Sequence, residues 1–414
     1  MKPRLWRLVV AALFSVACAP AAVPPAPPPG PAEPPPAPAL DTAAIKPNID
    51  SGRLERPEVV IPPSQPLVRA ALPVRLAMVG DINLGTSTLE GGLPPDSGRS
   101  FFAAVDTLLV GDLVIGNFEG VLADSGVSLK CGAPPDTGAV APKRRRARLR
   151  KPHPHCYAFS TPSYLAPRLA EAGFTHLNLA NNHANDMGAD ARSASDSILR
   201  SLHLGTYGPL GHVVIDTIRR GDSVTVVGLV GFTTYPFAYD LLDIRRSAEV
   251  VDSLRRMVDV LVVTFHGGTE GAAATRTGDG PEALAGEPRG DLRRWAHAVI
   301  DAGASAVVGH GPHVLRGVEF YAGRPIFYSL GNFATYRGFN LKGPLGITAV
   351  LQLTFAGDGA LLESRLVPLI QVPRKGPKPD PRRRAVTLLR QVTKLDFGPT
   401  GARIGDAGEI LPPP

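Results

Sequence analysis

Residues 306–313 read Ala-Val-Val-Gly-His-Gly-Pro-His, an apolar β-branched run that passes directly into two histidines, His310 and His313. A short run of this kind predicts a buried β-strand, and the glycines beside His310 predict a tight turn at its end. The same arrangement, an apolar run that ends in polar residues, occurs at six places in the chain. These polar ends are Asp81 and Asn83, Asn117 and Glu119, Asn181-Asn182-His183, His266, His310 and His313, and Asn332.

The polar ends predict one shared site. Strands of an α/β sheet present their carboxyl ends at a common edge, which is where ligands bind. Each cluster alone is weak evidence, because a single histidine or a Gly-Asp pair after a strand is common, so the prediction rests on the joint pattern. The mixture of carboxylate, amide and imidazole suits Mn, Fe or Zn. Two such ions about 3.5–4 Å apart would supply a nucleophile and clamp a transferring phosphoryl group.

The rest of the body alternates short β-branched runs with helical patterns, as in a layered α/β fold. Strands are predicted at residues 74–79, 113–115, 176–179, 224–230, 261–264, 306–308, 326–329 and 348–354. Helices are predicted at residues 101–110, 162–172, 190–202, 248–258 and 291–302. Gly173 and Gly303 follow two of these helices and are suitable stops.

The N-terminus has the pattern of an export signal. Three basic residues within the first seven precede an apolar run at residues 8–17, which is too short to span a bilayer as a mature helix. The run ends in Ser-Val-Ala before Cys18, a sequence similar to a bacterial lipobox, so we expect lipidation at Cys18. Cleavage near Ala21 and an uncleaved anchor are the alternatives. All three predict an exported protein of the bacterial cell envelope. If Cys18 is lipidated, the protein is a lipoprotein anchored to the membrane.

The chain is predicted to divide into four parts. Residues 1–18 are the signal and lipobox, and residues 19–72 are a proline-rich linker that cannot bury a core and would act as a spacer. Residues 73–371 form the α/β domain, with a basic insertion at about 124–158. Residues 372–414 form a Pro- and Arg-rich C-terminal extension.

The basic insertion accounts for the net charge of the chain. Residues 143–151 hold seven cationic side chains, equal to the formal charge of +7. They would either contact an anionic lipid or polymer or form a solvated loop. Nucleic acid is not expected as a partner, because the run has no interleaved aromatic residues and the chain is predicted to be exported. Cys131 and Cys156 bracket the run and would form a disulfide worth about 3 kcal/mol in an oxidising compartment, or stay as two thiols.

The order of the polar ends resembles that of the metallophosphoesterase motifs. The residue sequences around them are most similar to those of the CapA family of poly-γ-glutamate capsule biosynthesis. The resemblance covers residues 74–370. It is carried by residues 80–85 (Gly-Asp-Ile-Asn-Leu-Gly), 112–120, 179–186, 301–319 and 323–333. It implies a metallophosphoesterase-like α/β sandwich of two central β-sheets flanked by helices.

The resemblance also implies roles for individual residues. The implied metal ligands are Asp81, Glu119, Asn182, His266, His310 and His313, and His183 is implied as proton donor or transition-state stabiliser. Further candidate site residues are Asn83, Asn117, Glu270 and Asn332. The chain departs from the superfamily pattern where Asn83 replaces a histidine and where Asn117 and Glu119 stand in place of a bridging aspartate. It also has Gly267 where the family commonly has an aromatic residue.

Two functions follow as hypotheses. The first is a metal-dependent, phosphoesterase-like hydrolase that assists the synthesis, export or anchoring of an anionic capsule polymer, together with membrane synthase components. The second is a non-catalytic scaffold that binds such a polymer and has a degenerate metal site. A serine hydrolase is not expected, because the core has no Gly-x-Ser-x-Gly elbow.

Overall fold

The structure, a computed structural model, describes residues 72–126, 128 and 157–414. All of them lie in the second of the two units into which the chain divides, Met1–Pro62 and Pro63–Pro414. Cys18, Cys131, Cys156 and the basic run at 143–151 lie outside the described residues, so export, lipidation and the disulfide stay predictions. Among the helices that the structure describes, none is long and apolar enough to cross a membrane.

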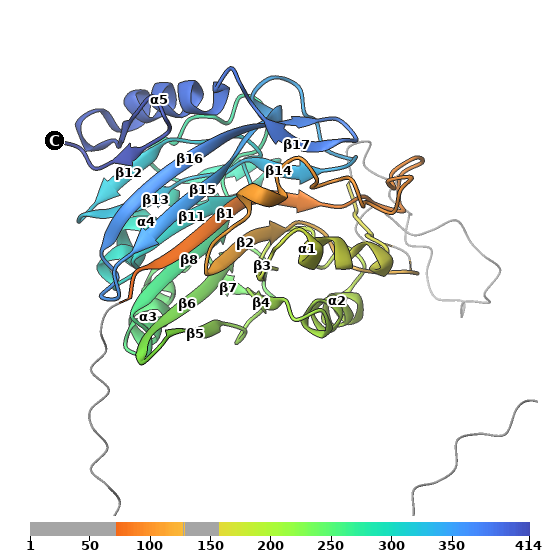
Figure 1. The fold of residues 1–414 in the computed structure, drawn as a ribbon, viewed down its shortest axis with the longest axis horizontal. Coiled ribbons are helices and arrows are strands. Elements are labelled where there is room, and N and C mark those ends of the chain that lie inside the picture. Colours follow the sequence, from red (N-terminus) through yellow and green to blue (C-terminus); the bar gives the residue numbers. More distant parts are fainter. Residues whose placement is uncertain (1–71, 127, 129–156) are drawn as a thin grey trace, which may run out of the picture. The chain divides into compact units, whose positions relative to one another are not determined.

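Two large β-sheets form the centre of the unit (Figure 1). The strands of the first sheet are β1 (Val74–Asn83), β2 (Leu113–Phe118), β3 (His176–Asn178), β4 (Gly205–Tyr207), β14 (Asn332–Thr335), β15 (Ile347–Phe355), β16 (Leu361–Val372) and β17 (Gly376–Pro379). Their order is β17-β16-β15-β1-β2-β3-β4, with β14 also paired to β1.

The second sheet contributes seven strands. They are β5 (Val214–Arg220), β6 (Ser223–Thr233), β7 (Tyr239–Asp240), β8 (Val260–His266), β11 (Ala306–His310), β12 (Val318–Tyr321) and β13 (Arg324–Phe327). Their order is β12-β13-β11-β8-β6-β5, with β7 beside β6. Two small hairpins complete the strands, β9 (Glu282–Leu284) with β10 (Glu287–Gly290), and β18 (Arg403–Ile404) with β19 (Ile410–Leu411).

Helices cover the sheets. They are α1 (Pro167–Glu171), α2 (Ala189–Ser201), α3 (Ile244–Arg255), α4 (Leu292–Asp301) and α5 (Arg384–Phe397), with short 3₁₀ turns at Asp106–Leu108, Ser163–Leu165, Gly343–Gly346 and Gly398–Thr400. Leu169 of α1 and Leu199 of α2 pack on the first sheet. Val251 of α3 and Trp295 of α4 pack on the second.

The main core lies between the two sheets, and β1 shows how the sequence builds it. Leu76 and Met78 point into the shared core with residues of β6, β8 and β11. Ala77 and Val79, one residue out of phase, point to the helix side of the first sheet. This period of two is what a strand buried on both faces requires. The predicted α/β sandwich of two central sheets flanked by helices is confirmed.

The C-terminal residues belong to the same packed unit. Residues 372–414, expected as an extension, supply β17 to the edge of the first sheet and α5 to its core. Ala385, Val386 and Leu389 of α5 are buried there against residues of β16 and β12.

One predicted helix differs in the structure. Residues 101–110 form successive turns that end in the 3₁₀ helix Asp106–Leu108. Backbone bonds three residues apart dominate, such as the one from Val105 N to Phe102 O. Phe101, Phe102, Val105 and Leu109 are still buried and pack in the core on the helix side of the first sheet.

Candidate metal centre

Strand pairing brings the predicted polar ends together. β1, β2 and β14 run parallel, and Asp81 pairs with Asn117 on one side and Asn332 on the other. β8 and β11 also run parallel, and their last residues, His266 and His310, are paired. The backbones approach closely here: a Cβ at Gly80 would lie 1.8 Å from the carbonyl oxygen of Gly331, so glycine is required.

Glu119 lies at the centre of the cluster. Its Oε1 is 3.6 Å from His313 Nε2, 3.8 Å from His266 Nε2 and 4.0 Å from His183 Nε2. The carboxylate is completely buried. Three imidazoles from three different loops and strands therefore face one carboxylate.

Asp81 is the second centre. Its Oδ2 is 3.0 Å from His313 Nδ1, and its Oδ1 is 3.5 Å from His310 Nδ1. His313 thus lies between the two carboxylates, and Asp81, Glu119 and His313 each offer a ligand atom within 4.8 Å of one another. Of the implied ligands, Asp81, Glu119, His266, His310 and His313 are brought together. Asn182 lies in the loop that carries His183 and is partly buried.

Several polar atoms of the cluster lack a hydrogen-bond partner among the described residues, although they are buried. They are both carboxylate oxygens of Glu119, Nε2 of His266, Nδ1 of His310 and Oδ1 of Asn332. Leaving such an atom unpaired costs about 1–3 kcal/mol, and more when it is charged. A divalent cation would accept lone pairs from these oxygens and nitrogens, and this donor set is the one Mn, Fe and Zn prefer. The residues therefore fit a metal.

The pKa values of the Glu119 and Asp81 carboxyl groups are shifted in opposite directions. Burial raises the pKa of Glu119 well above its usual value, with Asp81 and Glu270 adding to the effect and His313 opposing it. Burial also acts to raise the pKa of Asp81, but its interactions with His310 and His313 outweigh burial and hold that pKa far below the usual range. Asp81 is therefore a carboxylate at neutral pH, and Glu119 would gain most from a bound cation.

The pKa values of His266 and His313 are also shifted in opposite directions. Burial and the positive charge of Arg289 lower the pKa of His266 well below its usual value, so its imidazole is neutral. Burial opposes protonation of His313 as well, but Glu119, Asp81 and Glu270 together raise its pKa well above normal. In the metal-free chain the raised pKa favours a protonated His313, whose ring nitrogens face Asp81 and Glu119.

Two asparagines expected as possible site residues bond to the framework around the cluster. Asn117 donates from Nδ2 to Asp81 Oδ1 over 2.8 Å, and its own Oδ1 accepts from Asn178 and Asn181. Asn83 donates to the backbone carbonyl of Glu119 over 2.9 Å. Asn117 therefore holds the carboxylate of Asp81, and Asn83 holds the backbone of Glu119.

Glu270 and Asn332 border the cluster on the side of His313. Glu270 Oε2 is 3.6 Å from His313 Nε2, and its Oε1 accepts from the buried Arg289 over 2.7 Å. Burial acts to raise the pKa of Glu270, but His313 and Arg289 lower it overall. Asn332 donates to the carbonyls of His313 and Leu345, each over 3.2 Å, which holds the loop of His313.

His183 is oriented by an acidic partner that the sequence reading missed. Its Nδ1 lies 2.6 Å from Asp186 Oδ2, and the same oxygen accepts from Phe159 N over 2.8 Å. The Asp186 side chain thus directs Nε2 of His183 toward Glu119. Carboxylate-oriented histidine is a recurrent arrangement for proton transfer and for metal ligation.

Replacing Asp186 by alanine should lower the free energy of unfolding by about 1–3 kcal/mol, because the buried N–H of Phe159 loses its acceptor. Asp186→Asn keeps an oxygen at this place and should cost less. Urea denaturation of the two variants measures the difference. Equal losses in both would show that the charge of Asp186, and not its oxygen, stabilises the loop.

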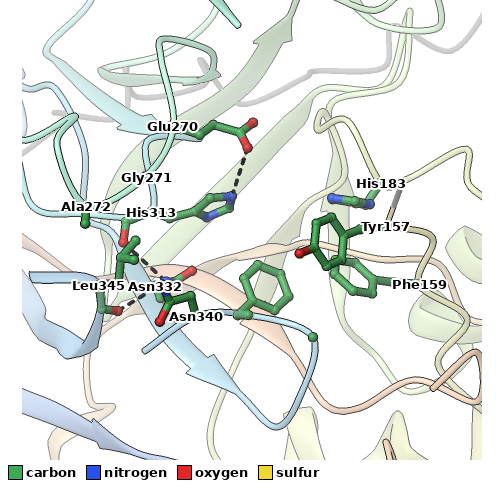
Figure 2. Close-up of a pocket in the computed structure, with 12 residues that line it drawn as sticks. Tyr157, Phe159, His183, Glu270, Gly271, Ala272, His313, Asn332, Asn340 and Leu345 are labelled. Carbon is green, nitrogen blue, oxygen red and sulfur yellow. Dashed lines mark hydrogen bonds and ion pairs between the residues drawn. The ribbon is translucent and has the colours of Figure 1, made fainter. Parts of the chain in front are cut away.

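A cavity of about 280 Å³ opens beside the cluster (Figure 2). Glu270 and His313 face each other on one side of it, and His183 lies on the other with Tyr157 and Phe159. Phe159 packs on His183 with ring centroids 4.3 Å apart and stacks on Phe339 at 4.9 Å. Phe339 meets His313 edge-on at 5.3 Å. An aromatic wall therefore separates one part of the cluster from solvent.

The residues missed from sequence share one property. Asp186, Asn178, Arg289, Phe159 and Phe339 contact the site through partners distant in the chain or through a loop. For Asp186 a signal existed, since it follows His183 by three residues within one turn.

Comparison with known proteins finds similarity to bacterial capsule synthesis proteins. The family described as "Bacterial capsule synthesis protein PGA_cap" matches residues 75–337. The PGA biosynthesis protein CapA of Bacillus subtilis (strain 168) is 29% identical over 185 residues, which cover 41% of this chain and 45% of that protein. The capsule biosynthesis protein CapA of Bacillus anthracis is 30% identical over 227 residues, 50% of each chain. The chain thus matches about half the length of these curated relatives.

Among solved structures, the 5'-nucleotidase precursor from Thermus thermophilus is similar with a TM-score of 0.39 and 14% identity. The similarity covers 77% of this chain and 58% of that chain.

Proposed function

Because the chain belongs to the bacterial capsule synthesis protein family PGA_cap, we propose that it takes part in making an anionic capsule polymer of the poly-γ-glutamate type, through a divalent-metal centre. The relatives' names, PGA biosynthesis protein and capsule biosynthesis protein, support the process. The site geometry supports the metal. Its ligands would be Asp81, Glu119, His266, His310 and His313.

One observation carries the metal assignment. Glu119 is completely buried, neither of its oxygens has a hydrogen-bond partner among the described residues, and three imidazole nitrogens lie within 4.0 Å of Oε1. A fold that only needed to be stable would not keep a buried carboxylate without a hydrogen bond, because desolvating it costs several kcal/mol. A cation makes the same arrangement favourable.

The residues around the centre can perform acid–base chemistry. A divalent ion, when bound, supplies Lewis-acid activation of a phosphoryl or acyl centre and of water. His183, held by Asp186, can carry a proton at Nε2 on the side facing Glu119. Phe159 and Phe339 shield that side from water, which strengthens the electrostatic interactions in the site.

Metal content of the purified full chain tests the proposal. We expect one to about two equivalents of Mn, Fe or Zn in the wild type and almost none in His310→Ala/His313→Ala. His203→Asn is the matched control. His203 is exposed and has a φ of 60°, a backbone region that asparagine tolerates. It should keep the wild-type metal content.

Absence of metal from the wild type, even after reconstitution, would overturn the metal centre. It would leave a scaffold that binds the polymer without catalysis as the better account. Metal retained in the double variant would instead show that the ion binds elsewhere in the chain. A metal-bearing wild type would then be assayed on phosphate esters and on γ-glutamyl polymers.

A further inference from the structure

A row of exposed cations runs along the C-terminal edge of the first sheet, outside the metal centre. We call it the cationic strip and define it as Arg374, Lys375, Lys378, Arg382 and Arg383. All five side chains are exposed, and none forms an ion pair with a carboxylate in the part of the chain that the structure describes. Asp380, the acidic residue within this segment, is buried and bonded to Arg384. The five charges are therefore available to a ligand.

Local stability does not explain the strip. Arg374 and Arg383 have φ values of 61° and 52°, a left-handed region where glycine or asparagine would be less strained. Arg382 and Arg383 also lie at the N-terminus of α5, where the helix dipole disfavours positive charge. Cations held at a cost to the backbone and to the helix indicate a role outside the fold itself.

Sheet topology places the strip at the same edge as the metal centre. β15 is antiparallel to β1, and β16 is antiparallel to β15, so β16 runs in the direction of β1. The turn after β16, which holds Arg374 and Lys375, therefore emerges at the sheet edge where β1 ends near Asp81.

Neighbouring strands β14, β16 and β17 connect the cavity at the metal centre with the cationic strip. Asn332, at the cavity, pairs with Asp81, and Thr335 lies three residues further along β14, about 10 Å away. Thr335 N and Oγ1 donate to Oε1 of Gln371 over 2.7 and 3.0 Å. Gln371 pairs with Pro377 of β17, next to Lys378.

We propose that the cationic strip is a docking surface for a linear polycarboxylate, which it guides toward the cavity at the metal centre. Five cations without ion pairs among the described residues, distributed from the turn after β16 to the start of α5, suit repeated carboxylates better than one compact anion. That the polycarboxylate is a γ-linked glutamate chain rests on the proposed function. The surface and its charge do not.

An anionic membrane fits this surface less well than a polymer does. A membrane-binding face adds apolar side chains to its cations, but residues 373–384 carry no exposed large hydrophobic residue. The apolar face of α5, which includes Val386, Leu389 and Val392, is turned into the protein and cannot insert into lipid.

Binding of γ-linked poly-glutamate of uniform length to the full chain, titrated at several salt concentrations, tests the proposal. Arg374→Glu/Lys375→Glu/Lys378→Glu should weaken binding at least about tenfold at low salt and flatten the dependence of log Kd on log salt. The matched control, Arg219→Glu/Arg245→Glu/Arg294→Glu, makes the same charge change at exposed arginines elsewhere and should stay within about twofold of wild type. If the reversal variant folds poorly, neutralising the same three residues to glutamine should give an intermediate loss.

Equal weakening in the strip and control variants, or none in either, would overturn the proposal. So would loss of binding to vesicles of anionic lipid with polymer binding retained, because the surface would then belong to a membrane. Arg374→Glu/Lys375→Glu/Lys378→Glu should keep the wild-type metal content while losing polymer affinity, because none of its three residues belongs to the metal centre. The failure of the metal centre and the failure of the strip are therefore separate results.

Discussion

Glu119→Gln is expected to raise the free energy of unfolding of the metal-free chain by about 1–3 kcal/mol and, in the same protein, to abolish metal binding. The two effects have one cause. Both carboxylate oxygens of Glu119 are buried without a hydrogen-bond partner among the described residues. Glutamine has nearly the same shape but cannot ionise, so it removes the cost of a buried charge together with one carboxylate ligand of the proposed metal.

The pH dependence of this gain has a fixed sign. Burial raises the folded-state pKa of Glu119, so the folded chain binds a proton more tightly than the unfolded chain does. Wild type and variant should be closest in stability below the unfolded-state pKa of about 4.3. The advantage of the variant should grow as the pH rises from there toward the raised folded-state value.

Guanidinium denaturation in chelator, followed by thermal melting with and without added Mn or Zn, measures both effects. Glu363→Gln, on the exposed face of β16, is the matched control and should change stability by less than about 0.5 kcal/mol. A Glu119→Gln chain that is less stable in chelator and still gains melting temperature from metal would show that Glu119 is a structural residue. The wild type would then owe its metal to other side chains.

The parts of the fold that were predictable are those in which local pattern and tertiary burial agree. The run at 306–308 became β11 because each of its residues packs in a core. The helix predicted at 291–302 is α4, capped by Asp291, whose side chain accepts from Arg294 N. Trp295 and Val299 on one face are buried against the second sheet, so amphipathic spacing and packing gave the same answer.

The C-terminal region was harder to predict, because its many proline and arginine residues obscure the spacing of its apolar residues. Residues 372–414 are rich in proline and arginine, yet α5 buries Val386, Leu389 and Phe397 at helical spacing. β16 was missed for a related reason. Its residues 362–365 are mostly polar, and Pro368 interrupts the β-branched pattern. Only pairing with β15 and β17 makes the segment a strand.

The residues of the site also fall into a group that could be predicted from the sequence and a group that could not. Residues at strand ends could be predicted to meet, because the edge of a parallel sheet brings such ends together whatever the details of the loops. The family resemblance that named them is confirmed by the match over residues 75–337. Asp186 and Arg289 could not be found this way, since each acts through the side chain it contacts, and those contacts depend on loops whose course has no periodic signal.

The loop that carries Glu270 is held by another residue of this kind, Arg316. Its side chain is 1% exposed and forms a two-pronged ion pair with Glu282, with distances of 2.7 and 2.8 Å. It also donates to the carbonyls of Ala274 and Thr269. Glu282 in turn accepts from Thr269 N over 2.7 Å. Arg316 and Glu282 together therefore fix the backbone immediately before Glu270.

Arg316→Ala is expected to lower the free energy of unfolding by about 3–5 kcal/mol, because it leaves a largely buried carboxylate and two carbonyls without their donor. Arg316→Lys should recover little, since an ammonium cannot supply the guanidinium fork. Urea denaturation gives the loss. The control is Arg245→Ala, which removes an arginine that is 79% exposed from its ion pair with Glu249 and should cost less than about 1 kcal/mol.

The double variant Arg316→Ala/Glu282→Ala separates the two sources of the loss. Without Glu282 there is no buried charge left to compensate, so the double variant should be more stable than the sum of the single losses predicts. Additive losses would show that Arg316 stabilises the chain through the carbonyls of Ala274 and Thr269 and not through the ion pair. In either case the loop before Glu270 loses its anchor, so metal affinity should fall in both variants while the Arg245→Ala chain keeps it.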